Sequence, residues 1–534
     1  MALKVLSALD TARTQYYHFK ATIVAGMGLF SDAYSLFCIP PITNMLGRIY
    51  YPHPHHSSQH HLPTNISLAM IAASLLGAAA GQLVFGCLGD RMGRRGVYGL
   101  SLLIMVAGSL ACGFSVCTTR GCVLGSLAVF RFALGVGIGG DYPLSATIMS
   151  EFANRNTRGA FIAGVFSMQG FGILASSMVT VVVCKIFAVG SRAGGGLSDQ
   201  HTPAGADVAW RVILMLGAVP AALTYYWRML MPETARYTAL VENNVLQAAR
   251  DMEKILDLPL SQIQEDKPLD DDELPQPTTM DSPEYPSSTF PLFSTRFLRR
   301  HGVELFSCAA TWFLLDVAFY SSNLFQSQIY QQYLAVDDST DVYEEAIKVA
   351  GLQALIAISA TIPGYYFTVF FIDRVGRRKI QLMGFTLMGF LYLGLGIPYF
   401  FWRKHKHAGF IILYGLTFFF ANFGPNTTTF IVPAELFPAR LRSTCHGISG
   451  ATGKIGAVVG AVGIQRAWGS SGEYNEGDPD SKLKPMRAAL VVLGAVCFLG
   501  TVVTYAFTPE TMRRSLEENE KERETESDGP GVAL

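Results

Sequence analysis

The sequence predicts an all-α membrane protein with twelve transmembrane helices arranged as two six-helix halves. Only 15% of its 534 residues are charged and 50% are hydrophobic, whereas a soluble protein carries about 25% charged residues. Long stretches contain no Asp, Glu, Lys or Arg, among them 97–117, 159–184 and 349–372. At about 1.5 Å per residue, each can cross a hydrocarbon core of about 30 Å as a helix, which satisfies its own backbone in lipid.

Twelve apolar spans can be delimited, with a long polar stretch between the sixth and the seventh. They cover 21–47, 66–89, 97–117, 121–145, 159–184, 209–230, 303–325, 349–372, 380–402, 409–434, 443–465 and 488–507. The polar stretch is acidic and rich in proline, which favours a partly disordered linker. We therefore predict an N-terminal half over 1–230, a cytoplasmic linker over 231–302, a C-terminal half over 303–508 and a cytoplasmic tail over 509–534.

The two halves repeat three short motifs at nearly constant separation. Asp-Arg-x-Gly-Arg-Arg begins at Asp90 and again at Asp373, and Pro-Glu-Thr occurs at 232–234 and at 509–511. A glutamate and an arginine with the same spacing follow span 4 and span 10, namely Glu151 with Arg158 and Glu435 with Arg442. Three motif pairs indicate an internal duplication of six spans.

Clusters of arginine orient the predicted bundle in the membrane. The short loops after spans 2 and 8 carry Arg91, Arg94, Arg95, Arg374, Arg377 and Arg378. Positive charge accumulates in cytoplasmic loops, and both loops lie on the same side as the chain ends. We expect cytoplasmic termini, although the basic loop at 403–406 falls on the other side in this arrangement.

Several classes of function are disfavoured by composition and motifs. Lys+Arg and Asp+Glu are equal at 41, which gives no reason to expect a nucleic-acid partner. No nucleophile–base pair, nucleotide-binding loop or cluster with metal-ligand spacing occurs, so we expect neither an enzyme, a cofactor nor a metal site. The histidines at 53–61 fit a solvated loop, and most of the nine cysteines lie in apolar stretches as small buried residues.

Ionisable residues inside predicted spans are the first functional candidates, because they are costly in a membrane. They are Asp32, Arg131, Asp141, Asp316 and Lys454. Their excess of carboxylate would repel an anion until a proton is taken up, which suits proton-coupled anion uptake but equally suits a cation transporter. In span 7, Trp312, Asp316, Tyr320 and Asn323 fall on one helical stripe and present donors and a protonatable carboxyl to one side.

The repeated Asp-Arg-x-Gly-Arg-Arg loops resemble the signature of the major facilitator superfamily. The segment 139–151, GGDYPLSATIMSE, resembles the signature of the plant high-affinity inorganic phosphate:proton symporter family, as do residues 8–30 and 420–447. The resemblance implies a major facilitator fold at the plasma membrane. It also implies import of inorganic phosphate, with arsenate as a further substrate candidate, together with protons by alternating access.

The resemblance also assigns roles to individual residues. Phosphate binding is expected of Tyr142, Gln169, Trp312, Asp316, Tyr320 and Asn426. Proton coupling is expected of Asp32, Asp141 and Asp316, with Arg131 and Lys454 pairing with carboxylates to control their protonation. The gating loops are expected to comprise Asp90, Arg91, Arg94, Arg95, Asp373, Arg374, Arg377 and Arg378, whose charges could latch neighbouring helices. Ser35 departs from the family, which usually has a second aspartate at this position.

Two alternative functions remain open from the sequence. The motif at 232–236, PETAR, resembles one in sugar:proton symporters of the same superfamily, although the signature in span 4 favours phosphate. A non-transporting phosphate sensor is a second alternative, because Ser35 removes a proton carrier and the tail is acidic. The tail also offers Ser515 and Ser527 to kinase or trafficking partners.

Overall fold

A computed structural model describes residues 16–51, 62–193, 205–242, 244, 247, 292, 294–333, 341–405, 408–469 and 484–516, and these are helical apart from short connections. Eleven helical segments of this part are long and apolar enough to cross a membrane. The predicted all-helical, multi-pass membrane architecture is therefore confirmed. The histidine loop, the acidic run at 265–273 and the tail beyond residue 516, including Ser527, lie outside the described residues.

The N-terminal half contains the helices from α2 to α10. They are α2 (Tyr16–Phe37), α3 (Ile39–Tyr50), α4 (Thr64–Met92), α5 (Arg94–Gly113), α6 (Arg120–Phe152), α7 (Arg158–Ala193), α8 (Gly205–Leu216), α9 (Ala218–Leu230) and α10 (Ala235–Leu240). The predicted spans 1 and 6 are each split into two helices, at Cys38 and Gly217.

The C-terminal half contains the helices from α13 to α21. They are α13 (Thr295–Tyr333), α14 (Val342–Ile356), the π-helical turn η1 (Ala357–Thr361), α15 (Ile362–Val375), α16 (Arg377–Gly396), α17 (Tyr399–His405), α18 (Ala408–Asn422), α19 (Pro425–Leu436), α20 (Arg442–Gly469) and α21 (Lys484–Phe507). Span 10 is interrupted between α18 and α19, where Gly424 precedes Pro425.

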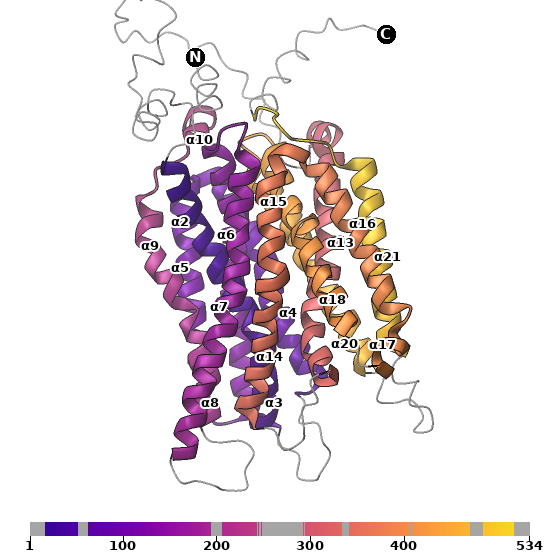
Figure 1. Ribbon diagram of the computed structural model, residues 1–534. Helices are drawn as coiled ribbons and strands as arrows, with labels where there is room; N and C mark the ends of the chain where they lie inside the picture. Colours follow the sequence, from indigo (N-terminus) through magenta and orange to yellow (C-terminus); the bar gives the residue numbers. More distant parts are fainter. Residues whose placement is uncertain are drawn as a thin grey trace, which may run out of the picture.

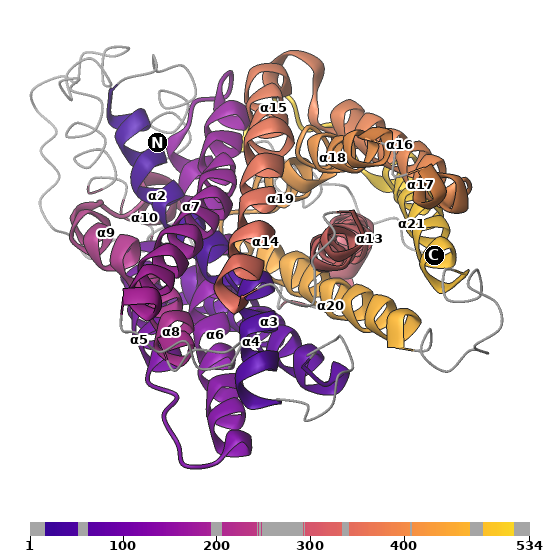
Figure 2. The ribbon, with the colours of Figure 1, turned by 60° about the horizontal axis from the view of Figure 1, so that its bottom comes forward.

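The two halves lie side by side, and α13 stands among α14, α18, α19, α20 and α21 (Figures 1 and 2). Their most extensive contacts join two pairs of spans, α4 with α20, and α7 with α14 and α15. Span 2 thus contacts span 11, and span 5 contacts span 8. In a duplicated chain each span corresponds to the span six places away, so the contact of spans 2 and 11 corresponds to the contact of spans 8 and 5.

The predicted span 11 differs from the other eleven. It forms the long helix α20, but it is not among the helices that qualify as spans by length and composition. Its polar residues Ser443, Thr444, His446, Ser449 and Lys454 are buried against other helices rather than facing lipid. The described residues therefore contain eleven segments that qualify as spans rather than the twelve predicted, and the polar side chains of α20 contact other helices.

Glycine allows α6 to approach α4 at close range. A Cβ added at Gly135 or Gly139 would collide with the backbone oxygens of Ser74 and Ala78 on α4. Small residues at such crossings let helix backbones touch, which is the usual way to pack membrane helices. The close crossing fixes the depth and rotation of α6, the helix that carries Arg131, Asp141 and Tyr142.

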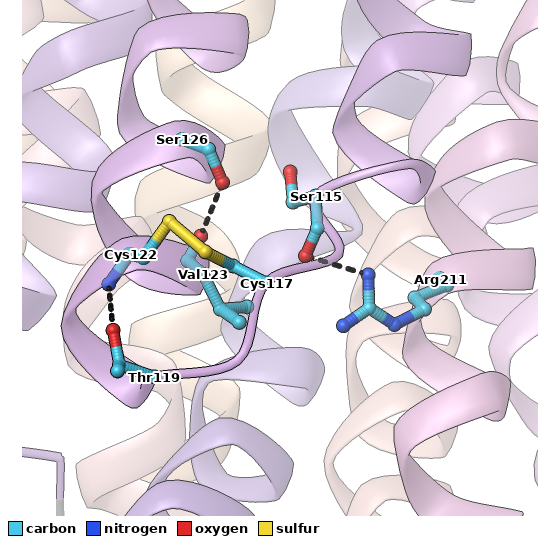
Figure 3. The surroundings of a disulfide bond; sticks show 7 residues. All are labelled: Ser115, Cys117, Thr119, Cys122, Val123, Ser126 and Arg211. Atoms are coloured by element: carbon cyan, nitrogen blue, oxygen red, sulfur yellow. Dashed lines mark hydrogen bonds between the residues drawn. A yellow bond between two sulfur atoms is a disulfide. The ribbon is translucent and has the colours of Figure 1, made fainter.

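A disulfide joins Cys117 in the connection between α5 and α6 to Cys122 in the first turn of α6, as Figure 3 shows. Cys117 and Cys122 close a short loop whose end is held by Arg211, which donates to the carbonyl of Ser115 at 2.8 Å. Six of the seven free cysteines are buried, as expected, but this pair was not foreseen. The disulfide marks one end of the bundle, which we call the disulfide end; the end with the arginine loops is the basic end.

Candidate functional site

The polar stripe predicted on span 7 lies on α13 and faces α20. Lys454 Nζ on α20 donates to Asp316 Oδ2 and to Tyr320 Oη, both at 3.0 Å. The three side chains are buried, with at most 8% exposure. The expected pairing of Lys454 with a carboxylate is confirmed. Because the two charges neutralise each other, a change in the protonation of Asp316 would release the charge of Lys454 for another partner.

Side chains from both halves form a chain of hydrogen bonds beside this ion pair. Gln169 Nε2 on α7 donates to Tyr142 Oη on α6 at 2.6 Å, and Tyr365 Oη on α15 donates to Gln169 Oε1 at 3.2 Å. Asn426 Nδ2 on α19 donates to Tyr365 Oη at 3.0 Å. Lys454 Nζ lies 5.1 Å from the centre of the Tyr142 ring, so the ion pair and the chain belong to one region between the halves.

Aromatic rings separate this region from the basic end. Phe166 on α7 stacks on Phe430 on α19, with ring centroids 4.4 Å apart. Tyr142 and Trp312 meet Phe430 edge to face at 6.2 and 6.5 Å. Phe166 and Phe430, which we call the aromatic floor, join the two halves between the site and the basic end.

The structure thereby gathers all six residues expected to contact substrate. They are Tyr142, Gln169, Trp312, Asp316, Tyr320 and Asn426, and each keeps at most 8% exposure. Amide, phenol and indole donors surround one buried cation and one carboxyl, a set that can bind the oxygens of a small anion. Tyr365, which links Asn426 to Gln169, was not singled out, because a tyrosine inside an apolar span carries no distinct sequence signal.

Asp141 has an arginine partner that the sequence analysis missed. Arg228 on α9 donates from Nη1 to Asp141 Oδ1 at 2.7 Å and from Nη2 to Oδ2 at 2.5 Å. Ser101 Oγ adds a bond to Oδ1 at 3.0 Å, and the guanidinium carbon lies 3.8 Å from the centre of the Tyr98 ring. Arg228 lies within predicted span 6, so the cost of a buried charge was a usable signal.

Asp32 and Ser35 differ from Asp141 in their surroundings. Both are buried on α2, and neither Asp32 carboxylate oxygen nor Ser35 Oγ has a hydrogen-bond partner among the described residues. The charges that act on Asp32 are those of Asp141, Arg228 and Lys454. Gly28, one helical turn before Asp32 on α2, packs against the Asp141–Arg228 pair, so Asp32 lies close to that pair.

Arg131 does not pair with a carboxylate in the part of the chain that the structure describes, so the expected pairing is wrong there. Its Nε donates to the carbonyl of Met70 at 3.1 Å, and its Nη2 donates to Ser74 Oγ at 2.9 Å. Both partners are on α4, because the close crossing of α4 and α6 brings this face of α4 within reach. Asp141 instead forms an ion pair with Arg228.

The repeated motifs meet at the basic end in equivalent contacts. Asp90 accepts bonds from the backbone N–H groups of Ser443 and Thr444 at the start of α20, at 3.2 and 2.7 Å. Asp373 accepts from the N–H of Ala160 at the start of α7, at 2.7 Å. A carboxylate at a helix N-terminus is favoured by the exposed N–H groups and by the helix dipole. Each aspartate thus caps a helix of the opposite half.

Two buried glutamates also link the halves at the basic end, and we call these contacts and the two aspartate caps the latch. Each glutamate binds one arginine from its own half and one from the other. Glu151 Oε1 accepts from Arg94 at 3.0 Å and from Arg442 at 2.8 Å. In the C-terminal half, Glu435 Oε1 accepts from Arg377 at 2.7 Å. Arg158 crosses from the N-terminal half to the same oxygen at 3.0 Å.

The remaining predicted gating arginines lie outside the crossed ion pairs. Arg95 and Arg378 donate to the carbonyls of Met229 and Tyr505, at 2.6 and 2.7 Å. The guanidinium carbon of Arg374 lies 3.8 Å from the centre of the Phe370 ring, and Arg91 is exposed. The Pro-Glu-Thr motifs also join the latch, because Thr234 and Thr511 donate to Glu151 and Glu435, both at 2.5 Å.

A bundle of two linked halves around a buried polar site is the architecture of a membrane transporter. The family model described as "Sugar (and other) transporter" matches residues 21–522. The chain belongs to this family of the major facilitator superfamily, and it is a multi-pass membrane transporter.

Curated relatives from plants are similar over the full length. The chain is 59% identical to "Probable inorganic phosphate transporter 1-9" of Arabidopsis thaliana, covering 99% of this chain and 98% of the relative. It is 51% identical to "Low affinity inorganic phosphate transporter 3" of Petunia hybrida, covering 99% and 97%. The resemblance to plant inorganic phosphate transporters is therefore confirmed.

The fold matches that of a solved transporter. The structure of the proton:xylose symporter XylE superposes with a TM-score of 0.68 at 17% identity, covering 95% of this chain and 98% of XylE.

Proposed function

We propose that this protein imports inorganic phosphate together with protons, by alternating access, across the plasma membrane. The observation that carries the proposal is the buried ion pair of Lys454 and Asp316, set among the donors of Tyr142, Gln169 and Asn426. The names of the relatives support phosphate as the substrate.

Coupling follows from the charge of the site. With Asp316 ionised, its carboxylate neutralises Lys454 and repels an anion at short range. Protonation of Asp316 leaves the ammonium group of Lys454 to hold the phosphate monoanion, and the carboxyl can then donate a hydrogen bond to it. Binding of the anion therefore favours uptake of a proton, and loss of the proton favours release of the anion. Asp32 and the Asp141–Arg228 pair provide the next titratable groups along α2 and α6.

Alternating access requires that one end of the bundle open while the other closes. The crossed ion pairs of Glu151 and Glu435, together with the aromatic floor, hold the basic end closed. We assign the basic end and the termini to the cytoplasm. The disulfide of Cys117 and Cys122 supports this assignment, because disulfides persist in oxidising, extracytoplasmic surroundings.

The proposal is tested by uptake of radiolabelled phosphate into proteoliposomes that contain the purified protein. Accumulation driven by an inward proton gradient, and lost when the gradient is collapsed, is expected. Radiolabelled xylose is assayed in parallel, and accumulation of xylose without phosphate would identify a sugar transporter instead. Phosphate binding without transport of either compound would identify a sensor. Arsenate is expected to compete with phosphate because it has the same shape and charge.

Replacement of Ser35 by aspartate is expected to extend uptake to higher external pH. The new carboxyl would lie one helical turn from Asp32, in a buried region where neither side chain has a partner among the described residues. Two carboxylates this close in a low dielectric cannot both ionise easily, so one retains its proton as the pH rises. Uptake is measured against external pH at equal surface abundance, with Ser35→Asn as the uncharged control. Superimposable curves for the parent and Ser35→Asp would contradict the prediction.

Removal of a latch glutamate is expected to open the basic end. Glu435→Gln weakens the bonds to Arg158 and Arg377 and leaves these buried cations without a full countercharge. Cys445, which is buried in the first turn of α20 near this end, then reports the opening. Its rate of modification by a maleimide should rise about tenfold, because a hydrogen bond to a charged group contributes about 1.5–3 kcal/mol. Modification is followed by mass spectrometry, and Glu344→Gln serves as an exposed control. An unchanged rate would show that Glu435 does not hold this end closed.

A further inference from the structure

A partly open cavity of about 70 Å³ lies between the halves, on the side of the central site that faces the disulfide end. Its lining comes from α2, α3, α4, α6 and α13. The polar part of the lining consists of Thr43, Asn44, Ser67, Ser74, Arg131, Tyr320 and Asn323. Tyr320 also accepts the bond from Lys454, so the cavity borders the central site directly.

Arg131 is the charged side chain in this lining and has no anionic partner among the described residues. It is 1% exposed, and its Nη1 has no hydrogen-bond acceptor in the described part of the chain. Its other bonds go to an uncharged carbonyl and an uncharged hydroxyl on α4. A buried cation without a countercharge is strongly unfavourable, and an anion in the cavity would relieve that cost.

Two carboxylates lie near the cavity, and neither pairs with Arg131 among the described residues. Glu345 accepts from Asn44 Nδ2 at 2.8 Å and is paired with Arg48 at 2.8 Å, at the rim of the cavity. Neither carboxylate oxygen of Asp32 has a hydrogen-bond partner among the described residues, so Asp32 does not bind Arg131 there. Arg131 thus lines the cavity while its Nη1 donor meets no acid in the described part of the chain.

We infer that this cavity is a second anion-binding site, in which Arg131 holds an inorganic oxyanion of the phosphate class before the anion reaches Lys454. The inference rests on the proposed function, which supplies the substrate. Arg131 provides the charge and a free N–H donor, while Ser67 and Asn323 offer neutral groups suited to the remaining oxygens. Phe37 stacks on Tyr320, with ring centroids 6.4 Å apart, at the boundary between the two sites.

The first test counts bound anions on the purified full-length protein. Equilibrium dialysis with radiolabelled inorganic phosphate should find two phosphates per chain in the parent and one in Arg131→Gln. Arg131→Lys keeps the charge and should retain the second phosphate with weaker affinity. Arg120→Gln is the matched control, because it removes one exposed positive charge from the same helix near the same end. One phosphate per chain in the parent, or two in Arg131→Gln, would overturn the inference.

A second test locates the anion and asks about its selectivity. Crystals soaked in arsenate should show anomalous density beside Arg131 in the parent and none there in Arg131→Gln. Chloride at the same concentration as phosphate should not displace the outer anion; displacement would overturn the assignment to an oxyanion.

The kinetic consequence separates this inference from the proposed function. At low external phosphate, Arg131→Gln should raise the KM for uptake about tenfold, because a charge that concentrates substrate ions in a cleft accelerates their capture by at least that factor. The maximal rate should fall less than the KM rises. If the parent takes up no phosphate, the proposed function fails; if the parent takes up phosphate and Arg131→Gln leaves both KM and stoichiometry unchanged, only the second site fails.

Discussion

Asp316→Asn is expected to abolish the accumulation of phosphate against a gradient while the protein still folds and reaches the membrane. Asparagine preserves the shape of the side chain and can hydrogen-bond to Lys454 or to phosphate, but it cannot carry a proton. The variant resembles the protonated state permanently. We therefore expect exchange of internal for external phosphate to persist and proton-driven accumulation to be lost.

Both activities can be measured on the same proteoliposomes, with and without a proton gradient. Glu344→Gln makes the same chemical change in an exposed ion pair with Lys348 and should leave both activities unchanged. Normal accumulation by Asp316→Asn would remove this carboxyl from proton coupling. Loss of exchange as well as accumulation would instead assign it to substrate binding alone.

Arg228→Gln is expected to destabilise the folded protein by about 3–5 kcal/mol, because it leaves Asp141 buried without its countercharge. Thermal unfolding of the purified protein and surface abundance in cells should both fall. The exposed pair of Lys348 and Glu344 supplies the matched control, since Lys348→Gln should change stability by less than about 1 kcal/mol. A stability equal to that of the parent would mean that Asp141 is satisfied without Arg228.

The double variant Arg228→Gln with Asp141→Asn separates folding from proton transfer. It removes both charges and leaves two amides that can hydrogen-bond, so most of the lost stability should return. If Asp141 belongs to the proton route, the stable double variant should still fail to couple uptake to the proton gradient. Full recovery of coupled uptake would restrict the pair to a structural role.

Much of the fold follows from local features of the chain. Uncharged stretches such as 97–117 and 349–372 became α5 and the α14–α15 segment, because a long apolar run has few other stable states in a membrane. The internal repeat was likewise visible, and its motifs now make equivalent contacts around Glu151 and Glu435. Asp316 and Tyr320 could be placed on one face, because helical periodicity alone sets their relation.

Local reasoning failed where a helix or a side chain depends on distant neighbours. The span predicted over 443–465 forms the helix α20, but it does not qualify as an apolar span, since its serines, threonines and Lys454 face other helices instead of lipid. The disulfide between Cys117 and Cys122 depends on how the loop between α5 and α6 turns. Neither hydropathy nor periodicity carries that information.

The sequence by itself determined the class of protein, the repeat, the arginine loops and the set of polar residues available for a transport site. Only the tertiary structure decided which charges pair. Asp141 binds Arg228 across the bundle, while Arg131, ten residues earlier on the same helix, is left facing a cavity. The reason is geometric, because hydropathy and periodicity describe each helix alone. Which side chains become partners depends on the depth and rotation at which helices pack. For α6, the close glycine crossing with α4 sets both.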